Sequence, residues 1–472
     1  MNYISTRRTA AESTDPLAFD SVLLAGLARD GGLYMPQSWP TFSADDIRAL
    51  RGLSYAELAV RVMSPFVADT IPQDEFSALV AETYAQFDHD AVAPLVQLEP
   101  NLWTMELFHG PTLAFKDYAL QFLGRAFDHV LGRKSQKITI VGATSGDTGS
   151  AAIEACRDRE AIEVFILHPA GRVSEVQRRQ MTTVLSDNVH NIAVEGTFDD
   201  CQDLVKAMFN DQKFCDRYNL SAVNSINWAR IMAQIVYYFW AGVHLGSPDR
   251  EVSFAVPTGN FGNILAGYCA RRMGLPVRDL IVGSNSNDIL TRFLETGSMV
   301  AEGVSPTLSP SMDIQVSSNF ERLLWELHDR DGAEVERLMA RFRQSGSYSV
   351  EEARWQRALQ TFAGRRFDDT ETKAEIARLY EHTGHLIDPH SAVGIAAARA
   401  AKTDPAVPLV TLATAHPAKF PDAVESATGI RPALPPRLAD LLEREERCHN
   451  LPNELSAVQA YVAGKLAEKD AA

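Results

Sequence analysis

One lysine stands in a sequence context that favours chemistry over surface exposure. Lys116 follows the apolar residues 113–115 and the turn residues Pro111 and Thr112, in the run GPTLAFKD. Burial lowers the pKa of a lysine, and such an amine can form a Schiff base and later carry protons. The alternative is a lysine at a helix start, whose stem covers apolar surface while its ammonium reaches water. The lysine alone does not decide between these interpretations.

A glycine-rich turn at 142–149 lies between a β-branched run and an alanine-rich segment. Its backbone N–H groups and hydroxyls, with a helix dipole behind them, can bind an anion. The turn fails the GxGxxG pattern and lacks the Lys-Ser/Thr ending of a P-loop, so a small carboxylate fits better than a nucleotide. The alternative is a tight strand-to-helix turn that binds nothing. The candidate residues are Thr144, Ser145, Gly146, Asp147 and Thr148.

A second glycine-rich turn begins at Pro257, again between a predicted strand and a predicted helix. Its glycines allow the chain to approach an anion closely, and the N–H groups of the following helix point toward it. This turn suits a phosphate monoester. Together with the first turn and Lys116, it implies a phosphorylated cofactor and a carboxylated substrate. The candidate residues are Gly259, Asn260, Phe261, Gly262 and Asn263.

The elements around these turns indicate an α/β fold. Short runs of buried-strand type alternate with helical segments, a pattern typical of parallel sheets with covered faces. The runs are 137–141, 164–167, 189–194, 252–256, 280–282 and 407–412. Residues 1–95 are predicted to be mostly helical, 319–381 purely helical, and the charged segment from 436 helical and peripheral. In 319–381, Phe320, Leu323, Leu324 and Leu327 have the spacing of one helix face.

Composition narrows the function classes. A chain of 472 residues predicts two or three domains, and a net charge of −16 argues against a nucleic-acid-binding surface. No apolar run reaches the roughly 20 residues of a membrane helix, and no secretory h-region is present. The five cysteines form no CxxC pair, and no histidine has metal-ligand spacing. We therefore expect a cytoplasmic protein with reduced thiols, without a metal, a nucleic-acid partner or a membrane.

Four motifs together resemble a known family. GPTLAFKD, GATSGDTGSAA, PTGNFGN and TAHPAKF occur in the order and spacing of threonine synthases, pyridoxal-phosphate (PLP) enzymes of the tryptophan-synthase-β-like group, fold type II. GLARDGGLYMP at 26–36 and SMDI at 311–314 resemble the longer-chain bacterial and fungal branch. The likeness covers nearly the whole chain.

The resemblance implies a role for each matching residue. Lys116 matches the lysine that carries PLP, residues 259–263 the loop that holds its phosphate, and Thr414 the hydroxyl at the pyridine nitrogen. Residues 144–148 match the loop for the substrate carboxylate. The segment with Asn224, Ser225 and Arg230 matches the one that contacts the substrate's phosphate. A surface helix arginine is the alternative for Arg230. Many relatives in the wider fold have Asn at the position of Asp147, whose role, toward the ring hydroxyl or structural, stays open.

The implied reaction converts O-phospho-L-homoserine and water to L-threonine and phosphate by γ-elimination and β-addition. This is a lyase reaction of amino-acid biosynthesis, in the aspartate pathway. One alternative is a related phospho-lyase that releases a keto acid. Another is a non-catalytic binding module that keeps the fold. The sequence leaves open whether the protein is a monomer or a homodimer.

The resemblance also implies a domain organisation with two parallel-sheet domains. A large PLP domain is expected at 96–117 and 246–435, with a helical insertion at 319–381. A small substrate-binding domain is expected at 118–245. An N-terminal segment, 1–95, and a C-terminal helical segment, 436–472, complete the chain.

Overall fold

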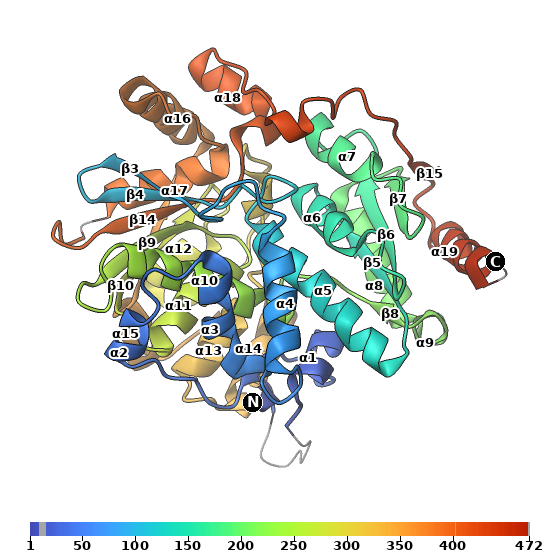
Figure 1. Cartoon of the computed structure of the whole chain (residues 1–472), viewed down its shortest axis with the longest axis horizontal. Helices are drawn as coiled ribbons and strands as arrows, with labels where there is room; N and C mark the ends of the chain where they lie inside the picture. The colour runs from blue at the N-terminus through green and yellow to red at the C-terminus, as the bar shows by residue number, and fades with distance from the viewer. Residues whose placement is uncertain (9–15, 402, 471–472) are drawn as a thin grey trace. The chain divides into compact units, whose positions relative to one another are not determined.

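The structure, a computed structural model, describes residues 1–8, 16–401 and 403–470 (Figure 1). The chain forms two compact units. Unit 1 comprises Met1–Ala119 and Ser225–Pro432, and unit 2 comprises Leu120–Asn224 and Ala433–Ala472. Both units have a sheet with helices packed against it, in agreement with the predicted α/β class.

Unit 1 contains a six-stranded sheet in the order β13-β10-β9-β14-β4-β3. All neighbouring strands are parallel except β3, which pairs antiparallel with β4. Every residue of β9 and of β14 is buried, which explains why these strands are uninterrupted apolar or small-residue runs. The strands are β3 (Leu95–Glu99), β4 (Leu102–Glu106), β9 (Val252–Pro257), β10 (Val277–Ser284), β13 (Phe362–Arg366) and β14 (Leu409–Ala413).

Helix α17 (Pro389–Ala400) packs across β9, β10, β13 and β14. Its alanines and Gly394 allow this close approach, since a Cβ at Gly394 would lie 2.9 Å from the ring of Pro257. The other helices of unit 1 are α1 (Phe19–Ala25), α2 (Ala44–Arg48), α3 (Tyr55–Val67), α4 (Gln73–Tyr84), α10 (Trp228–His244), α11 (Gly262–Arg272), α12 (Ile289–Thr296), α13 (Phe320–Leu327), α14 (Gly332–Ser345), α15 (Glu352–Leu359), α16 (Asp369–Thr383) and α18 (Pro421–Thr428). Two small antiparallel pairs join β1 (Tyr3–Ser5) to β2 (Tyr34–Pro36) and β11 (Ser298–Val300) to β12 (Ser347–Ser349).

The prediction that residues 319–381 are purely helical is wrong in two places. Helices α13 to α16 are present, and α13 buries the predicted face, but β12 and β13 interrupt the series. Strand β13 is the edge strand of the large sheet, parallel to β10. Gly364 within it leaves room for Thr291, whose Cα would lie 2.9 Å from an added Cβ. Pairing with a distant strand therefore decides the structure of this stretch over its helical surroundings.

Unit 2 contains a parallel five-stranded sheet in the order β15-β7-β6-β5-β8. The strands are β5 (Ile138–Ala143), β6 (Ile162–Pro169), β7 (Val189–Val194), β8 (Leu220–Ser221) and β15 (His449–Leu451). The helices are α6 (Asp147–Cys156), α7 (Glu175–Thr182), α8 (Phe198–Asn210), α9 (Gln212–Tyr218) and α19 (Leu455–Asp470). Helix α5 (Lys116–Lys134) begins in unit 1 and continues into unit 2.

The C-terminal segment is not peripheral, contrary to our expectation for 436–472. Strand β15 pairs with the edge of β7 (Figure 1). Val458 and Val462 of α19 are fully buried in the core with Leu204 and Met208. The predicted boundary at 245 also differs from the structure, because the buried helix α10 belongs to unit 1. The final residues thus complete the core of unit 2.

Val462→Ala should lower the free energy of unfolding of unit 2 by about 2 kcal/mol. The substitution removes two buried methyl groups and leaves a cavity. Hydrogen exchange of the β7 amides measures this change locally. Val316→Ala is the control, since Val316 is 60% exposed and its truncation should cost less than about 0.5 kcal/mol. Equal protection of β7 in both variants would contradict the packing described for α19.

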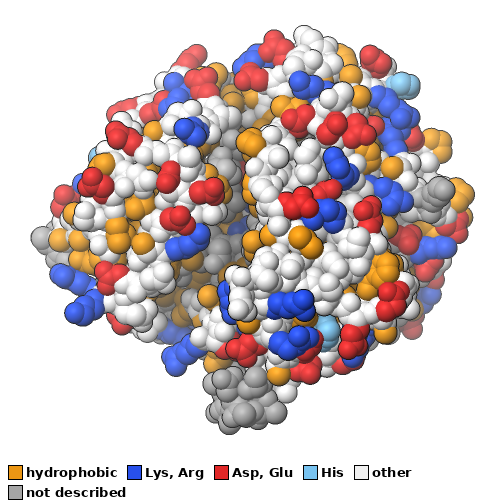
Figure 2. All heavy atoms as spheres, turned by 180° about the vertical axis from the view of Figure 1, so that it is seen from behind, with side chains coloured by type: hydrophobic (Ala, Val, Ile, Leu, Met, Phe, Trp, Pro, Cys, Tyr) orange, Lys and Arg blue, Asp and Glu red, His pale blue; other side chains and the backbone are white. Residues whose placement is uncertain are grey.

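The surface mixes charges of both signs. Acidic, basic and apolar side chains are interspersed over the face shown in Figure 2. Among the described residues, no helix combines the length and hydropathy needed to span a bilayer.

Candidate functional site

Lys116 is the first residue of α5 and follows a turn built around Asp117. The buried carboxylate of Asp117 accepts hydrogen bonds from the Thr112 backbone N–H at 2.8 Å and from Thr112 Oγ1 at 2.7 Å. Only glycine fits at 110, because a Cβ there would lie 2.4 Å from Asp117 Cβ. Lys116 is 8% exposed, and its Nζ donates to Ser311 Oγ at 3.4 Å. This burial does not fit the alternative of a lysine whose ammonium lies in solvent.

Thr414 lies beside the lysine turn, just beyond the end of β14. The Phe115 N–H donates to the Thr414 carbonyl at 2.8 Å, and Ala114 forms a β-bridge with Ala415. The Thr414 N–H donates to Ser391 Oγ at 3.0 Å. The carboxyl ends of parallel strands share one edge of a sheet, the usual location of ligands in α/β folds. Thr414 and Lys116 therefore meet at the edge where a ligand is expected.

The turn between β9 and α11 lies at the same edge, because β9 neighbours β14. Phe261 has φ 61°, in the left-handed region, and directly precedes the first turn of α11. The first N–H groups of a helix lack intrahelical partners, and the helix dipole favours an anion there. A Cβ at Gly259 would lie 3.0 Å from the Ser311 carbonyl oxygen, so glycine permits close packing of the turn.

Two buried side chains near α11 have donors without partners. Arg230, on α10, is 4% exposed, and its Nε and Nη1 bond to nothing. Asn263 accepts a hydrogen bond from Tyr237 Oη at 2.6 Å, but its Nδ2 has no partner. Burial lowers the pKa of the Arg230 guanidinium to about 10, so it remains a cation at neutral pH. A buried unpaired cation is costly, and an anion would relieve the cost. The surface-arginine alternative for Arg230 is wrong.

The unpartnered donors of Arg230 and Asn263 indicate that the residues present fit a phosphorylated ligand. A phosphorylated cofactor such as PLP needs an amine for its aldehyde, an anion-binding turn for its phosphate and a polar partner for its ring nitrogen. Lys116, the turn at 259–263 and Thr414 supply these groups along one sheet edge. The residues fit PLP.

Ser225 is linked to the same turn through Asn319. Asn319 Nδ2 donates to the Ser225 carbonyl at 3.1 Å and to the Asn260 carbonyl at 3.0 Å. Arg322 holds the next residue, donating from Nη2 to the Ile226 carbonyl at 2.6 Å. Asn224 is the last residue of its stretch of unit 2.

The candidate carboxylate turn of unit 2 uses several of its own polar groups internally. Thr144 Oγ1 accepts from the N–H groups of Gly146 at 2.9 Å and Gly149 at 2.8 Å. Asp147 Oδ1 accepts from Gln177 Nε2 at 2.8 Å. Gly146 has φ 143°, and a Cβ there would lie within 2.6 Å of the Gln177 amide. The Thr144 and Asp147 side chains and the Gly146 and Gly149 N–H groups thus hold the turn, and the hydroxyls of Ser145 and Thr148 are its candidate ligand groups.

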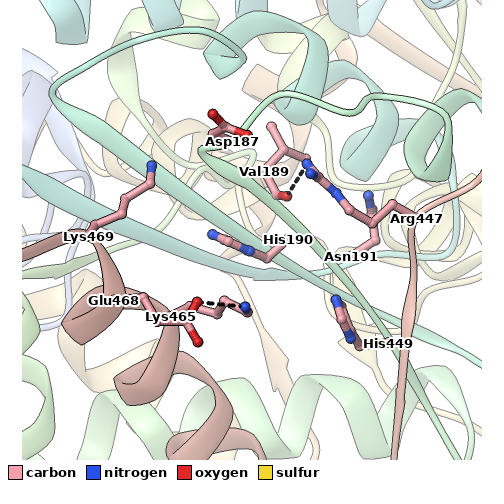
Figure 3. Close-up of a pocket in the computed structure, with 9 residues that line it drawn as sticks. All are labelled: Asp187, Val189, His190, Asn191, Arg447, His449, Lys465, Glu468 and Lys469. Carbon is pink, nitrogen blue, oxygen red and sulfur yellow. Dashed lines mark hydrogen bonds and ion pairs between the residues drawn. The ribbon is translucent and has the colours of Figure 1, made fainter. Parts of the chain in front are cut away.

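A cavity of about 310 Å³ in unit 2 contains none of the predicted site residues (Figure 3). Its lysines pair with carboxylates, Lys465 with Glu468 at 2.8 Å and Lys469 with Glu163. Arg447 donates to the Ser186 and Val189 carbonyls. The cations that line this cavity are therefore engaged already. Within the residues that the structure describes, no group of His, Cys, Asp or Glu side chains is arranged to hold a metal ion.

The sequence interpretation missed several residues that surround the site. Ser311 belongs to the SMDI motif, which we used for resemblance alone. Asp388 precedes a proline at the start of α17, a pattern that signals a helix N-terminus and no chemistry. The remaining missed residues are Asn319, Arg322, His390 and Ser391.

The buried lysine, the glycine-rich turn at 259–263 and the α/β fold indicate a PLP-dependent enzyme, and the pyridoxal-phosphate dependent enzyme family model matches residues 88–341. The threonine synthase N-terminal and C-terminal family models match residues 2–84 and 391–462. A threonine synthase of Pseudomonas aeruginosa is 59% identical over 464 residues, covering 98% of each chain. The chain belongs to the threonine synthase family.

Solved structures agree with this assignment. A PLP-bound threonine synthase from Brucella melitensis matches with a TM-score of 0.96 and 55% identity, covering 98% of this chain and 99% of the other. A yeast threonine synthase matches with a TM-score of 0.94 and 40% identity, covering 99% of both chains. The cofactor of this chain is PLP.

Proposed function

We propose that the chain converts O-phospho-L-homoserine and water to L-threonine and phosphate in the cytoplasm, as a fold type II enzyme. The main support for this proposal is the buried side chain of Arg230. A buried guanidinium without a counter-ion, in the same unit as Lys116, calls for an anionic group, and the substrate brings a phosphate dianion. The predicted independence from nucleic acids and membranes rests on the net charge of −16 and the soluble-type composition.

When bound, PLP would supply an electron sink for the negative charge that develops on the substrate carbons. Lys116 would hold the cofactor, and its ε-amine would move protons at Cα and Cβ of the substrate, the role of a general base and acid. Thr414 offers a neutral hydroxyl to the ring nitrogen, which leaves that nitrogen unprotonated.

The remaining candidate residues bind and orient the cofactor and the substrate. The turn of Gly259, Asn260, Phe261, Gly262 and Asn263 holds the cofactor phosphate, and Arg230 with Asn224 and Ser225 holds the substrate phosphate. Residues 144–148 receive the substrate carboxylate through N–H groups and hydroxyls. The bond from Gln177 to Asp147 favours a structural role for that carboxylate.

Product analysis tests the proposed reaction. Purified enzyme is incubated with O-phosphohomoserine, and threonine, phosphate and 2-oxobutyrate are measured together. Threonine and phosphate in equal amounts support the proposal. 2-Oxobutyrate in place of threonine would identify the phospho-lyase alternative, and purified protein without cofactor or product would revive the binding module.

Gly262→Val should weaken cofactor binding. A Cβ added at 262 would lie 3.3 Å from Asn319 Nδ2 and 3.5 Å from Ile231 Cδ1, and the branched side chain would prevent close approach of the phosphate. Equilibrium dialysis of PLP against the apoenzyme measures the affinity. Gly132→Val is the matched control, since a Cβ there meets nothing within 4 Å. Equal PLP affinity in both variants would show that the turn is misassigned.

A further inference from the structure

Asp388 is a fully buried carboxylate at the N-terminus of α17. Oδ1 accepts from the Ser391 N–H at 3.1 Å and from Ser391 Oγ. Oδ2 accepts from the His390 N–H at 2.9 Å and from His390 Nδ1 at 2.7 Å. The two backbone bonds are ordinary capping, but the two side-chain bonds exceed what a helix cap requires. Each of them continues toward the site.

The first connection runs through His390 to Lys116. An ionised carboxylate only accepts, so the proton of this bond is on His390 Nδ1, and Nε2 is left as an acceptor. His390 Nε2 accepts the Ser311 N–H at 3.2 Å, and Ser311 Oγ accepts from Lys116 Nζ at 3.4 Å. His390 is 4% exposed, so solvent does not compete for these bonds. The tautomer of His390 therefore fixes the position of Ser311.

The second connection runs through Ser391 to Thr414. Ser391 Oγ donates its proton to Asp388 and accepts the Thr414 N–H at 3.0 Å. The Thr414 carbonyl accepts the N–H of Phe115, the residue before Lys116, at 2.8 Å. The Asp388 carboxylate makes the Ser391 hydroxyl a donor, just as it makes His390 Nδ1 a donor.

We propose that Asp388 is a positioning residue that fixes both Lys116, through His390 and Ser311, and Thr414, through Ser391. It touches neither cofactor nor substrate in this role. Because the carboxylate can only accept, it orients one donor in each connection, and the free acceptor at the other end binds a backbone N–H at the site. The proposal rests on the roles of Lys116 and Thr414 in the proposed function.

Asp388→Asn tests the proposal with the smallest change of shape. The amide oxygen keeps the two bonds from Ser391, whereas the new NH2 group loses the capping bond from the His390 N–H and faces His390 Nδ1, which becomes an acceptor. The proton then moves to Nε2, which meets the Ser311 N–H donor to donor. We expect the variant to bind PLP and to lose about tenfold to a hundredfold in kcat with a nearly unchanged KM, as for other small displacements of reacting groups.

The readout independent of activity is the visible absorbance of the holoenzyme as a function of pH. We expect its titration midpoint to move by more than about half a pH unit, since the surroundings of Lys116 Nζ change. Asp331→Asn is the control, because the Asp331 side chain caps α14 by accepting bonds from the Ala333 and Glu334 N–H groups, and these bonds do not connect it to the site. A midpoint and kcat in Asp388→Asn equal to those of the control would overturn the proposal.

Two substitutions at His390 separate positioning from stability. His390→Gln offers an amide oxygen to the Ser311 N–H and should retain the wild-type midpoint, whereas His390→Leu offers none and should shift it. His328→Leu controls for the loss of another buried histidine. Equal midpoints in the Gln and Leu variants would contradict the connection. The absorbance titration needs only PLP on Lys116, so it still tests the network if the wild-type enzyme makes no threonine.

Discussion

Borohydride reduction of the purified enzyme should attach the cofactor to Lys116 and to no other lysine, with loss of the visible band. Lys116 is buried, follows an apolar run and lies beside Thr414, so its amine is held at the edge where PLP fits. Peptide mapping by mass spectrometry identifies the modified residue.

Lys419 is the internal comparison for this experiment. It is fully buried in the same unit, but its Nζ donates to the Thr112 carbonyl at 2.6 Å, so the ammonium supports the turn before Lys116. Lys116→Ala should lower kcat by at least about 10²–10⁴-fold, the usual contribution of a general acid–base group. An adduct on Lys419, or wild-type turnover in Lys116→Ala, would contradict the assignment of Lys116 as the lysine that carries the cofactor.

Arg230→Ala should keep its cofactor and colour but lose roughly tenfold to a hundredfold in kcat/KM with O-phosphohomoserine. Arginine's planar fork suits bidentate phosphate binding, and a charge-assisted contact of this kind contributes about 1.5–3 kcal/mol. Steady-state kinetics measure the loss. Binding of unphosphorylated amino acids to the cofactor, followed by absorbance, should be almost unchanged.

Arg322 shows what a structural buried arginine does in the same unit. Burial lowers the pKa of both guanidinium groups to about 10, but Arg322 bonds through Nε, Nη1 and Nη2 to Tyr34, Asn319 and Ile226. Removal of Arg322 should destabilise the fold, whereas removal of the unpaired Arg230 should not. If Arg230→Ala weakened phosphorylated and unphosphorylated ligands equally, the residue would be structural and the proposed phosphate site wrong.

The sequence predicted β5, β6, β7, β9, β10 and β14, because buried parallel strands are uninterrupted apolar runs. It did not predict β3, β4, β8 or β15. It failed for β13, since Phe362–Arg366 becomes a strand only by pairing with β10. For α19 the helix was predicted correctly, but the burial of Val458 and Val462 was not, because the segment is charged. In both cases the partner lies far away in the chain, and no local pattern records it.

The same contrast between local patterns and long-range contacts applies to the candidate site. Lys116 and the two glycine-rich turns are contiguous motifs, so their residue types could be interpreted directly. The bond from the Ser311 N–H to His390 joins separate segments, and nothing in the local sequence indicates it. The lack of a counter-ion at Arg230 likewise became visible only with its surroundings in place.

The division of both units along the chain has a consequence for synthesis on the ribosome. A nascent chain that has emerged only to Pro432 has all the residues of unit 1, yet unit 2 still lacks its second stretch. The β7 edge is then unpaired, and the core around Leu204 and Met208 is open until Val462 has emerged. Unpaired strand edges and exposed apolar surface invite association with other chains. Nascent chains should therefore depend on chaperones longest at unit 2, although most of that unit is made before the second half of unit 1.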